Sequence, residues 1–254
     1  HQEVFHKYLI KPLAMLAAFL ERTAMPLVYA KTEFITISDS SHQEMTDMGL
    51  GLVGMHIIHP GVDLESFVPG AKDDQPVVLY LGRLKAYKSV DVLIQAFKLV
   101  KEKVPSARLV IVGGGEEESV LKKLASKLGF TQDVAYFAGK ITDAEKISWL
   151  QRAWVLVNPS MMEGWGITSI EANACGVPVV ASNVPGLRDS VKNPHTGYLV
   201  THGDVDTFAA RIIRILENKS IRDFMAVESV EWANNFDWDK SAAKSLAVIM
   251  EDGN

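Results

Sequence analysis

The sequence predicts an α/β protein built on a doubly wound parallel sheet. Short apolar runs follow one another along the chain and alternate with longer segments of helical periodicity. Strands that are apolar on both faces indicate a parallel sheet with helices on either side. The runs are Val77–Leu81, Arg108–Val112, Val134–Phe137, Trp154–Val157 and Val177–Ala181, and the helical segments between and after them are 89–104, 116–129, 142–152 and 166–175.

A different set of elements precedes this pattern. Residues 2–25 have helical spacing around Pro12, and their apolar part is too short for a bilayer, which needs about 20 residues. Phe34–Ser38 is predicted to be a strand, followed by a capped helix start at 39–44 and a second short strand at Met55–Ile58. Three helices are expected after the sheet, at 204–217, 220–234 and 237–249.

The carboxyl ends of the predicted strands carry the polar and glycine-rich segments. Right-handed crossovers place these ends on one edge of a parallel sheet, where doubly wound folds bind ligands. We therefore expect a site at this edge, built from Gly82-Arg83, Gly113–Gly115, Gly139-Lys140, Asn158–Gly166 and Ser182–Gly186.

Composition argues against several functional classes of protein. Of 254 residues, 48% are hydrophobic and 22% charged, which is typical of a globular protein. The net charge of −5 argues against a nucleic-acid-binding surface. Cys175 is the single cysteine, so no internal disulfide forms, and its apolar surroundings favour a packed thiol over a nucleophile. The chain begins at His1, and we expect a fragment or a processed product.

The segment from Ser160 to Val180 carries the most specific signal. Glu163 and Glu171 have seven residues between them, and Gly166 opens a helix between them. The free N–H groups and positive dipole end of such a helix suit an anion such as a diphosphate. Carboxylates beside an anion site make sense where they accept hydrogen bonds from sugar or ribose hydroxyls. This combination predicts a nucleotide-sugar pocket, although glutamates can also occur by chance in a loop–helix–strand unit.

These residues resemble the E-x7-E motif of retaining GT-B glycosyltransferases, the "group 1" family that uses nucleotide-diphosphate sugars. Pro159, Ser160, Gly164, Gly166, Ala172 and Gly176–Val180 also match. The resemblance extends over residues 31–250 and implies a Rossmann-like donor-binding domain. One departure is Leu187-Arg188-Asp189, where the family usually has a glutamate near the position of Asp189.

The resemblance implies a role for each candidate site residue. Arg83 and Lys88, in a G-R-L…K pattern, would stabilise the departing diphosphate, and Glu163 would hold the donor sugar; these three are the expected catalytic residues. Glu171 would bind the ribose. The other expected nucleotide-sugar-binding residues are Gly82, Gly114, Lys140, Ile141, Ser160, Gly164, Gly166, Ile167 and Thr168. The alternative is that Arg83 and Lys88 are two solvated surface cations, but their position after a strand and their spacing favour the functional role.

Two other ligand types are weakly indicated. Gly113–Glu116 invites a dinucleotide interpretation, but Glu118 stands where G-x-G-x-x-G needs its third glycine. Asp204-Val-Asp206 and Asp237-Trp-Asp239 have the D-x-D spacing of some metal sites, yet both begin predicted helices, where aspartate caps free N–H groups. We therefore expect no metal and no cofactor, and a donor substrate such as a UDP- or GDP-sugar.

The resemblance divides the chain into three parts. Residues 1–59 would be the remnant of an N-terminal acceptor-side domain, 60–236 the C-terminal nucleotide-sugar-binding domain, and 237–254 a helix crossing back. We expect a retaining, metal-independent hexosyltransferase that is incomplete as this fragment. A binding-only nucleotide-sugar module and a GT-B-fold sugar-nucleotide epimerase are the alternatives.

The expected partners are a nucleotide sugar and a carbohydrate or lipid-linked acceptor, without nucleic acid. We expect a cytoplasmic location. Lys7 and Lys11 beside the apolar segment raise a weak hypothesis of peripheral association with the inner face of a membrane. Apolar helices in residues 1–59 also predict a homodimer formed through this remnant.

Overall fold

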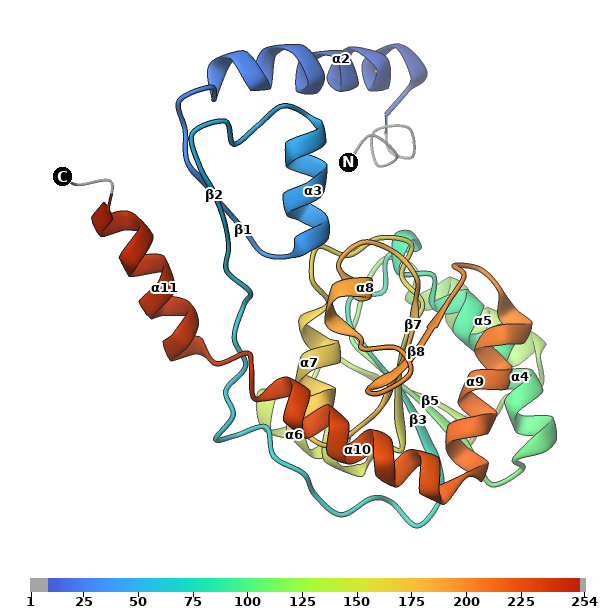
Figure 1. Cartoon of the computed structure of the whole chain (residues 1–254). Helices are drawn as coiled ribbons and strands as arrows, with labels where there is room; N and C mark the ends of the chain where they lie inside the picture. Colours follow the sequence, from blue (N-terminus) through green and yellow to red (C-terminus); the bar gives the residue numbers. More distant parts are fainter. Residues whose placement is uncertain (1–8, 252–254) are drawn as a thin grey trace. The chain divides into compact units, whose positions relative to one another are not determined.

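A computed structural model describes residues 9–251 of the chain (Figure 1). Its internal contacts divide it into two units, one of His1–His59 with Lys244–Asn254 and one of Pro60–Ala243. Predictions that fall on residues 1–8, which include Lys7 and the start of the first helix, and on 252–254 lie outside the described residues.

The larger unit contains a six-stranded sheet in the order β5-β4-β3-β6-β7-β8, and every neighbouring pair is parallel. The predicted fold class, α/β with a doubly wound parallel sheet, is confirmed. The strands are β3 (Val77–Leu81), β4 (Arg108–Val112), β5 (Ala135–Gly139), β6 (Val155–Asn158), β7 (Val179–Ser182) and β8 (Gly197–Val200).

Helices cover both faces of this sheet (Figure 1). Val78 and Tyr80 of β3 pack into one buried cluster, and Val77 and Leu79 pack into the other, because side chains alternate along a strand. The first cluster takes in α4 (Val90–Lys103), α5 (Glu118–Lys127) and α9 (Val205–Glu217), and the second takes in α6 (Asp143–Arg152) and α7 (Ile167–Ala174). Helix α10 (Lys219–Ala233) contributes to both, Met225 to the first and Ala233 to the second.

Strand β8 corrects the sequence-based prediction, which gave the sheet five strands. Gly197–Val200 is short, begins with glycine and sits in a region of mixed polarity, so its pattern is weak. Its pairing with β7 makes it a strand. A Cβ on Gly197 would lie 1.8 Å from the Val179 carbonyl oxygen, so the two backbones approach closely only because residue 197 is glycine.

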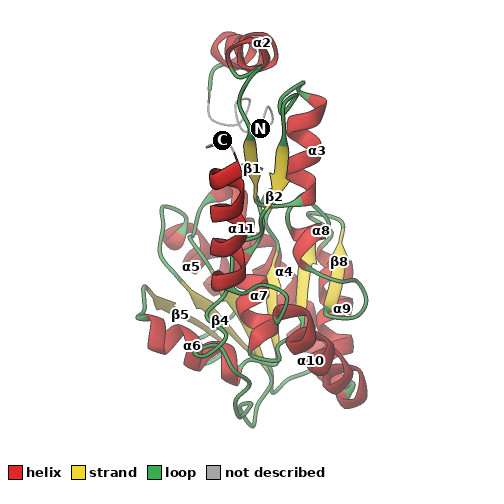
Figure 2. Cartoon of the chain, turned by 60° about the vertical axis from the view of Figure 1, so that its left-hand side comes forward, coloured by secondary structure: helices red, strands yellow, loops and turns green. Residues whose placement is uncertain are grey.

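The smaller unit contains a two-stranded parallel sheet of β1 (Phe34–Thr36) and β2 (Met55–Ile57), visible in Figure 2. Its helices are α2 (Lys11–Val28) and α3 (Asp39–Asp47), and α11 (Trp238–Glu251) begins in the larger unit and ends in this one. Strand β1 ends earlier than the predicted Ser38, because the Ser38 side chain caps α3 by accepting from Ser41 N–H at 3.1 Å.

Helix α2 continues beyond the predicted end at residue 25. Pro12 lies in the first turn, where a missing N–H costs nothing, and Pro26 lies in the last turn. None of the helices that the structure describes has the length and apolarity that a bilayer crossing needs.

The remaining predicted helices lie within three residues of their expected ends, and two further elements appear. These are a 3-10 turn, η1 (Ala86–Lys88), and the short helix α8 (Leu187–Ser190). Asp204 caps α9 as expected, since its carboxylate accepts from Thr207 N–H at 3.0 Å.

The sheet order contains a switch point between β3 and β6. From β3 the chain runs outward through β4 and β5, then returns to the other side of β3 and runs outward again through β6, β7 and β8. The connections after β3 and β6 therefore leave in opposite directions, and doubly wound sheets bind ligands at the carboxyl ends of the strands at such a point. The segments after these two strands are 82–89 and 159–166.

Candidate functional site

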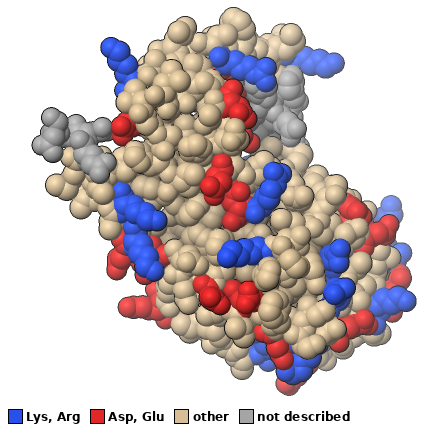
Figure 3. Space-filling view, in the orientation of Figure 1, with Lys and Arg blue, Asp and Glu red and all other residues tan. Residues whose placement is uncertain are grey.

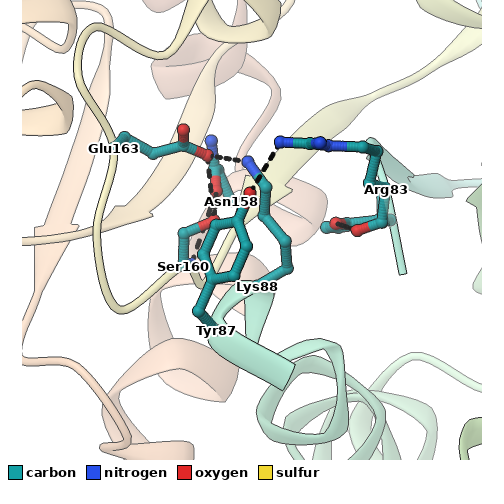
Figure 4. Close-up of polar contacts among 7 residues, drawn as sticks. Arg83, Tyr87, Lys88, Asn158, Ser160 and Glu163 are labelled. Atoms are coloured by element: carbon teal, nitrogen blue, oxygen red, sulfur yellow. Dashed lines mark hydrogen bonds and ion pairs between the residues drawn. The ribbon is translucent and has the colours of Figure 1, made fainter. Parts of the chain in front are cut away.

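Lys88 and Glu163 form an ion pair across the switch point (Figure 4). The lysine follows β3 and the glutamate follows β6, and their side chains are only 14% and 16% exposed. Ser160 Oγ lies 3.0 Å from Glu163 Oε1 and 2.6 Å from Asn158 Oδ1. The carboxylate of Glu163 is therefore held from two sides, by an ammonium and by a buried hydroxyl.

Arg83 extends from the start of the same segment, and its guanidinium donates to Tyr87 Oη at 2.9 Å (Figure 4). The Tyr80 hydroxyl donates to the Arg83 carbonyl oxygen at 2.9 Å and fixes the backbone beneath the guanidinium. Burial raises the pKa of Tyr80 well above its ordinary value, so this hydroxyl stays protonated as a donor.

The 82–89 segment is also tied to its neighbours through the backbone. Met161 N–H donates to the Tyr87 carbonyl oxygen at 2.8 Å, which joins it to the segment after β6. Leu84 N–H donates to the Gly114 carbonyl oxygen at 3.1 Å, which joins it to the segment after β4. The placement of Lys88 therefore depends on three strand ends rather than on one loop.

Glycines let the segments after β3 and β4 approach. A Cβ on Gly113, whose φ is +126°, would lie 1.9 Å from the Gly82 carbonyl oxygen. Gly114 has more room: its Cβ would lie 3.5 Å from Lys140 Cγ, which places Lys140 and the segment after β5 beside it. Three adjacent loops thus carry the predicted residues Gly82, Gly114 and Lys140. Ile141 follows Lys140 and lies just before Thr142, the N-cap of α6.

The 159–166 segment is a tight loop that ends at the first turn of α7. Gly166 is its N-cap with φ +81°, a left-handed conformation that favours glycine. Gly186 supports the loop from outside, because a Cβ there would lie 2.3 Å from the Glu163 carbonyl oxygen. Gly164 is exposed, while Ile167 and Thr168 are half-buried in the first turn of α7.

Glu171 pairs with a lysine of its own. Lys146 Nζ on α6 lies 2.9 Å from Glu171 Oε1 and 4.9 Å from the centroid of the Phe67 ring. Burial raises the pKa of the Glu171 carboxyl, and the hydrogen bond from Lys146 opposes this rise. The two glutamates of the predicted motif therefore sit in separate ion pairs, one at the end of β3 and one against α6.

Of the predicted catalytic and binding residues, the structure brings Lys88, Ser160 and Glu163 into one network, with Arg83 adjacent through Tyr87. The remaining predicted residues line neighbouring loops or α7. Sequence reasoning placed Asn158 at this edge, as the first residue of Asn158–Gly166, but did not name it as a binding residue, and it did not single out Tyr80, Tyr87 or Lys146. Asn158 could have been chosen, since it is the polar residue that closes an apolar strand. Lys146 carries no such signal, because its position depends on how α6 packs.

The site combines fixed positive charge with acceptor oxygens. Within residues 9–251 no group of three or more histidine, cysteine, aspartate or glutamate side chains is arranged to hold a metal ion. Lysines and arginines are interspersed with acidic residues on the face seen in Figure 3, and no single-sign patch dominates it. Such an arrangement can bind an anionic group at Arg83 and Lys88 and hydroxyl groups at Glu163.

Solved structures resemble this chain. Sucrose-phosphate synthase from Thermosynechococcus elongatus superposes with a TM-score of 0.82 at 26% identity, over 91% of this chain and 61% of that one. HepE from Anabaena, solved with UDP and glucose, has a TM-score of 0.77 at 21% identity, over 85% and 62% of the two chains. The likeness confirms the predicted GT-B type fold.

The curated proteins that resemble this chain in sequence are named as glycosyltransferases. A D-inositol 3-phosphate glycosyltransferase of Kribbella flavida is 32% identical over 229 residues, which are 83% of this chain and 54% of that protein. One of Mycobacteroides abscessus is 35% identical over 207 residues, 75% of this chain and 45% of that protein. The chain spans about half the length of the curated relatives it matches. The family model described as glycosyl transferases group 1 matches residues 62–229, which is well over half of the 254 residues, and the chain therefore belongs to that family.

Proposed function

We propose that this chain supplies the donor site of a retaining, metal-independent hexosyltransferase that uses a nucleotide-diphosphate sugar. The observation that carries the proposal is the Lys88–Glu163–Ser160 network at the switch point of the sheet, with Arg83 beside it. Membership of the glycosyl transferases group 1 family supports the reaction class. Because the chain spans about half of its relatives, the activity of a whole protein is part of the proposal.

In the proposed reaction Arg83 and Lys88 bind the donor diphosphate. The bond between the anomeric carbon and the diphosphate oxygen breaks, and negative charge develops on the departing group. A hydroxyl oxygen of the acceptor bonds to the anomeric carbon, and the hydroxyl proton passes to the departing diphosphate. A guanidinium and an ammonium already fixed near that group stabilise the charge without further reorganisation. These two cations fill the role that a divalent metal fills in other sites, which supports metal independence.

Glu163 and Glu171 would accept hydrogen bonds from the sugar and the ribose, respectively. Glu163 is fixed by Lys88 and Ser160, so its carboxylate is held in place at the switch point before the donor enters. Glu171 is held by Lys146 at 2.9 Å on α7, near the helix N-terminus where Ile167 and Thr168 would meet the phosphates. Gly82, Gly114, Lys140 and Ile141 would line the remaining contacts through backbone and side-chain groups.

The acceptor class, a carbohydrate or lipid-linked molecule, is also part of the proposal. Several relatives are named for transfer to inositol phosphate, and structural neighbours were solved with UDP or with UDP and a sugar. These names support UDP and UDP-glucose as the first probes. A cytoplasmic location and weak association with a membrane surface stay predictions.

Isothermal titration of the 254-residue chain with UDP, GDP and UDP-glucose tests the donor site. We expect binding of at least one of them, unchanged by a chelator. If none of them binds at millimolar concentration, the donor-site proposal is wrong. If binding needs an added divalent cation, the metal-independent part is wrong.

A binding-only module is the second candidate. It is favoured by one observation, that the residues proposed to hold the donor all lie within the single unit Pro60–Ala243. Release of UDP from UDP-glucose in the presence of sugar acceptors separates the two: turnover supports the transferase, and tight binding without turnover supports the module. Product analysis also separates the transferase from an epimerase, which would change the sugar without releasing it.

A further inference from the structure

Ser89, the residue after Lys88, has an unusual backbone. Its φ and ψ are 50° and 40°, and it is the one residue other than glycine with positive φ between residues 9 and 251. A Cβ makes this left-handed conformation unfavourable, so it persists only where neighbouring contacts fix it. Ser89 is 7% exposed, so those contacts come from the protein.

The side chain of Ser89 does not make the capping hydrogen bond that its position would allow. Ser89 is the N-cap of α4, where a serine oxygen normally accepts from the backbone N–H two or three residues later, but it makes no such bond here. Instead Ser89 Oγ and His202 Nε2 lie 3.0 Å apart, a hydrogen-bond distance for either tautomer of the ring. The side chain of Ser89 therefore bonds to His202, while its backbone N–H donates to the Ala86 carbonyl oxygen at 3.2 Å.

His202 lies in the loop between β8 and α9, far from Ser89 in the sequence. Helices α4 and α9 belong to the same covered face of the sheet, so their starting ends carry Ser89 and His202 to one place. The loop itself is firm, because Asp204 N–H donates to the Thr201 carbonyl oxygen at 3.1 Å and Asp204 caps α9. His202 is thus a fixed support.

The segment that His202 supports carries Lys88. Ser89 lies between η1 and α4, so its left-handed conformation sets the angle between these two elements. Lys88 is the last residue of η1, and its ammonium pairs with Glu163. Tyr87 is fixed from the other side by Met161 N–H. Between these two anchors the orientation of Lys88 has little freedom.

We propose that His202 is a positioning residue, which acts through Ser89 to hold Lys88 at the donor phosphates. The inference rests on the proposed function of Lys88, and it adds a residue from the last strand–helix loop to the donor site. His202 itself contacts neither Lys88 nor, in the proposal, the ligand. Its whole effect passes through the conformation of residue 89.

Amide hydrogen exchange without ligand is the first test, since it does not depend on nucleotide binding. In His202→Ala and in Ser89→Ala the hydrogen bond is lost and the strained Cβ remains, so exchange in residues 84–92 should rise by about three- to tenfold. In the double variant Ser89→Gly with His202→Ala, glycine adopts the left-handed conformation without support, so exchange should return toward the wild-type rate. His195→Ala, another loop histidine of the same unit, is the control and should change nothing in this segment.

Titration with UDP-glucose and UDP is the second test. His202→Ala should weaken binding by about three- to tenfold, and Ser89→Gly in the same background should restore it, while the melting temperature changes by no more than a few degrees. A purely structural role for His202 in the loop before α9 predicts no rescue by a substitution at residue 89.

The outcomes distinguish the two proposals. If His202→Ala leaves exchange in residues 84–92 unchanged, or if glycine at residue 89 does not restore it, the positioning role is wrong whatever binds. If exchange behaves as expected but neither UDP nor UDP-glucose binds the wild type, the proposed function fails and the support of Lys88 stands. If exchange behaves as expected and binding is equal in all variants, His202 does not act on the donor site.

Discussion

At the scale of single residues, the two ion pairs of the site differ from surface pairs. Lys88–Glu163 and Lys146–Glu171 have side chains between 12% and 22% exposed. Exposed pairs contribute little to stability, whereas groups partly removed from water interact more strongly and lose more when a partner is deleted. Each pair also holds a charged group where the proposed ligand would meet it.

Replacing Lys88 by alanine should weaken UDP binding more than replacing Arg83. Loss of a charge-assisted hydrogen bond costs about 1.5 to 3 kcal/mol, and Lys88→Ala also leaves the Glu163 carboxylate uncompensated beside the phosphates. Arg83 is exposed, so its loss is partly made up by water. Calorimetric titration of both variants measures the difference.

The matched control for this prediction is Lys85→Ala. Lys85 lies in the same segment but pairs with the exposed Glu116 at 3.2 Å, so its removal should leave UDP affinity within about twofold. Unchanged affinity in both Lys88→Ala and Arg83→Ala would contradict the phosphate assignment.

Substitutions of Glu163 and Glu171 should affect the binding of UDP and of UDP-glucose differently. Glu171→Gln should weaken UDP and UDP-glucose alike, because both contain the ribose. Glu163→Gln should weaken UDP-glucose alone, by about tenfold, since a charged acceptor becomes a neutral one. Titration of each variant with both ligands gives the comparison, and equal losses for both ligands in both variants would mean that the roles are misassigned.

At the scale of elements, the irregular segment before β3 is held in place by hydrogen bonds of two of its residues, Lys72 and Asp73. Arg152 on α6 donates to both carboxylate oxygens of Asp73, at 2.8 and 2.9 Å. Trp154 Nε1 donates to the Asp73 carbonyl oxygen at 2.8 Å, and Lys72 Nζ donates to that of Cys175 at 3.3 Å. These bonds join the segment to the C-terminal ends of α6 and α7, whereas the loops of the site adjoin the N-terminal ends of these helices.

The Lys72 ammonium should make stability depend on pH. Burial lowers the pKa of Lys72 from 10.5 to about 8. Between these two pH values the unfolded chain binds more protons than the folded one at this group, so its contribution to stability rises with pH; below pH 8 the full cost of burying the charge is present. The free energy of unfolding of Lys72→Met, relative to the wild type, should therefore fall as the pH rises through this window.

Urea unfolding of both proteins at several pH values measures this slope. The lost hydrogen bond to Cys175 lowers the stability of Lys72→Met by an amount independent of pH, so the slope is the decisive readout. Lys123→Met, which removes an exposed lysine, controls for the change in net charge. A constant difference between wild type and Lys72→Met across the window would show that the ammonium is not destabilised by burial.

At the scale of the whole molecule, exposed apolar side chains gather on α2. Leu13, Met15, Phe19 and Leu27 are between 51% and 80% exposed. Apolar patches of this kind often mark an interaction surface. The homodimer through residues 1–59 therefore stays a prediction with a physical basis.

Charge placed on α2 should oppose this association. We expect the chain to sediment and scatter light as more than a monomer at micromolar concentration, and Phe19→Glu combined with Leu27→Glu to shift it toward the monomer. Val227→Glu, at a 68% exposed position on α10, is the control. A wild-type chain that is monomeric at every concentration would exclude the dimer.

Local patterns sufficed for most elements and for the position of the site. Continuous apolar runs alternating with helical periodicity gave five of the strands, because strands buried on both faces have no other simple pattern. Glu163, Lys88 and Arg83 could be predicted to lie near one edge, because parallel connections place all carboxyl ends there. Strand β8 was missed because it is only four residues long and begins with glycine, although its tyrosine and valine favour strands.

By itself the sequence determined the α/β class, the edge at which the candidate site lies and the residue types at that edge, since these follow from periodicity and from the handedness of the chain. Only the tertiary structure decided which side chains meet. The pairing of Lys88 with Glu163, Lys146 with Glu171 and Ser89 with His202 joins residues between 25 and 113 positions apart. Such contacts depend on the order of the strands and on the packing of the helices over them, and neither is encoded in any local stretch of residues.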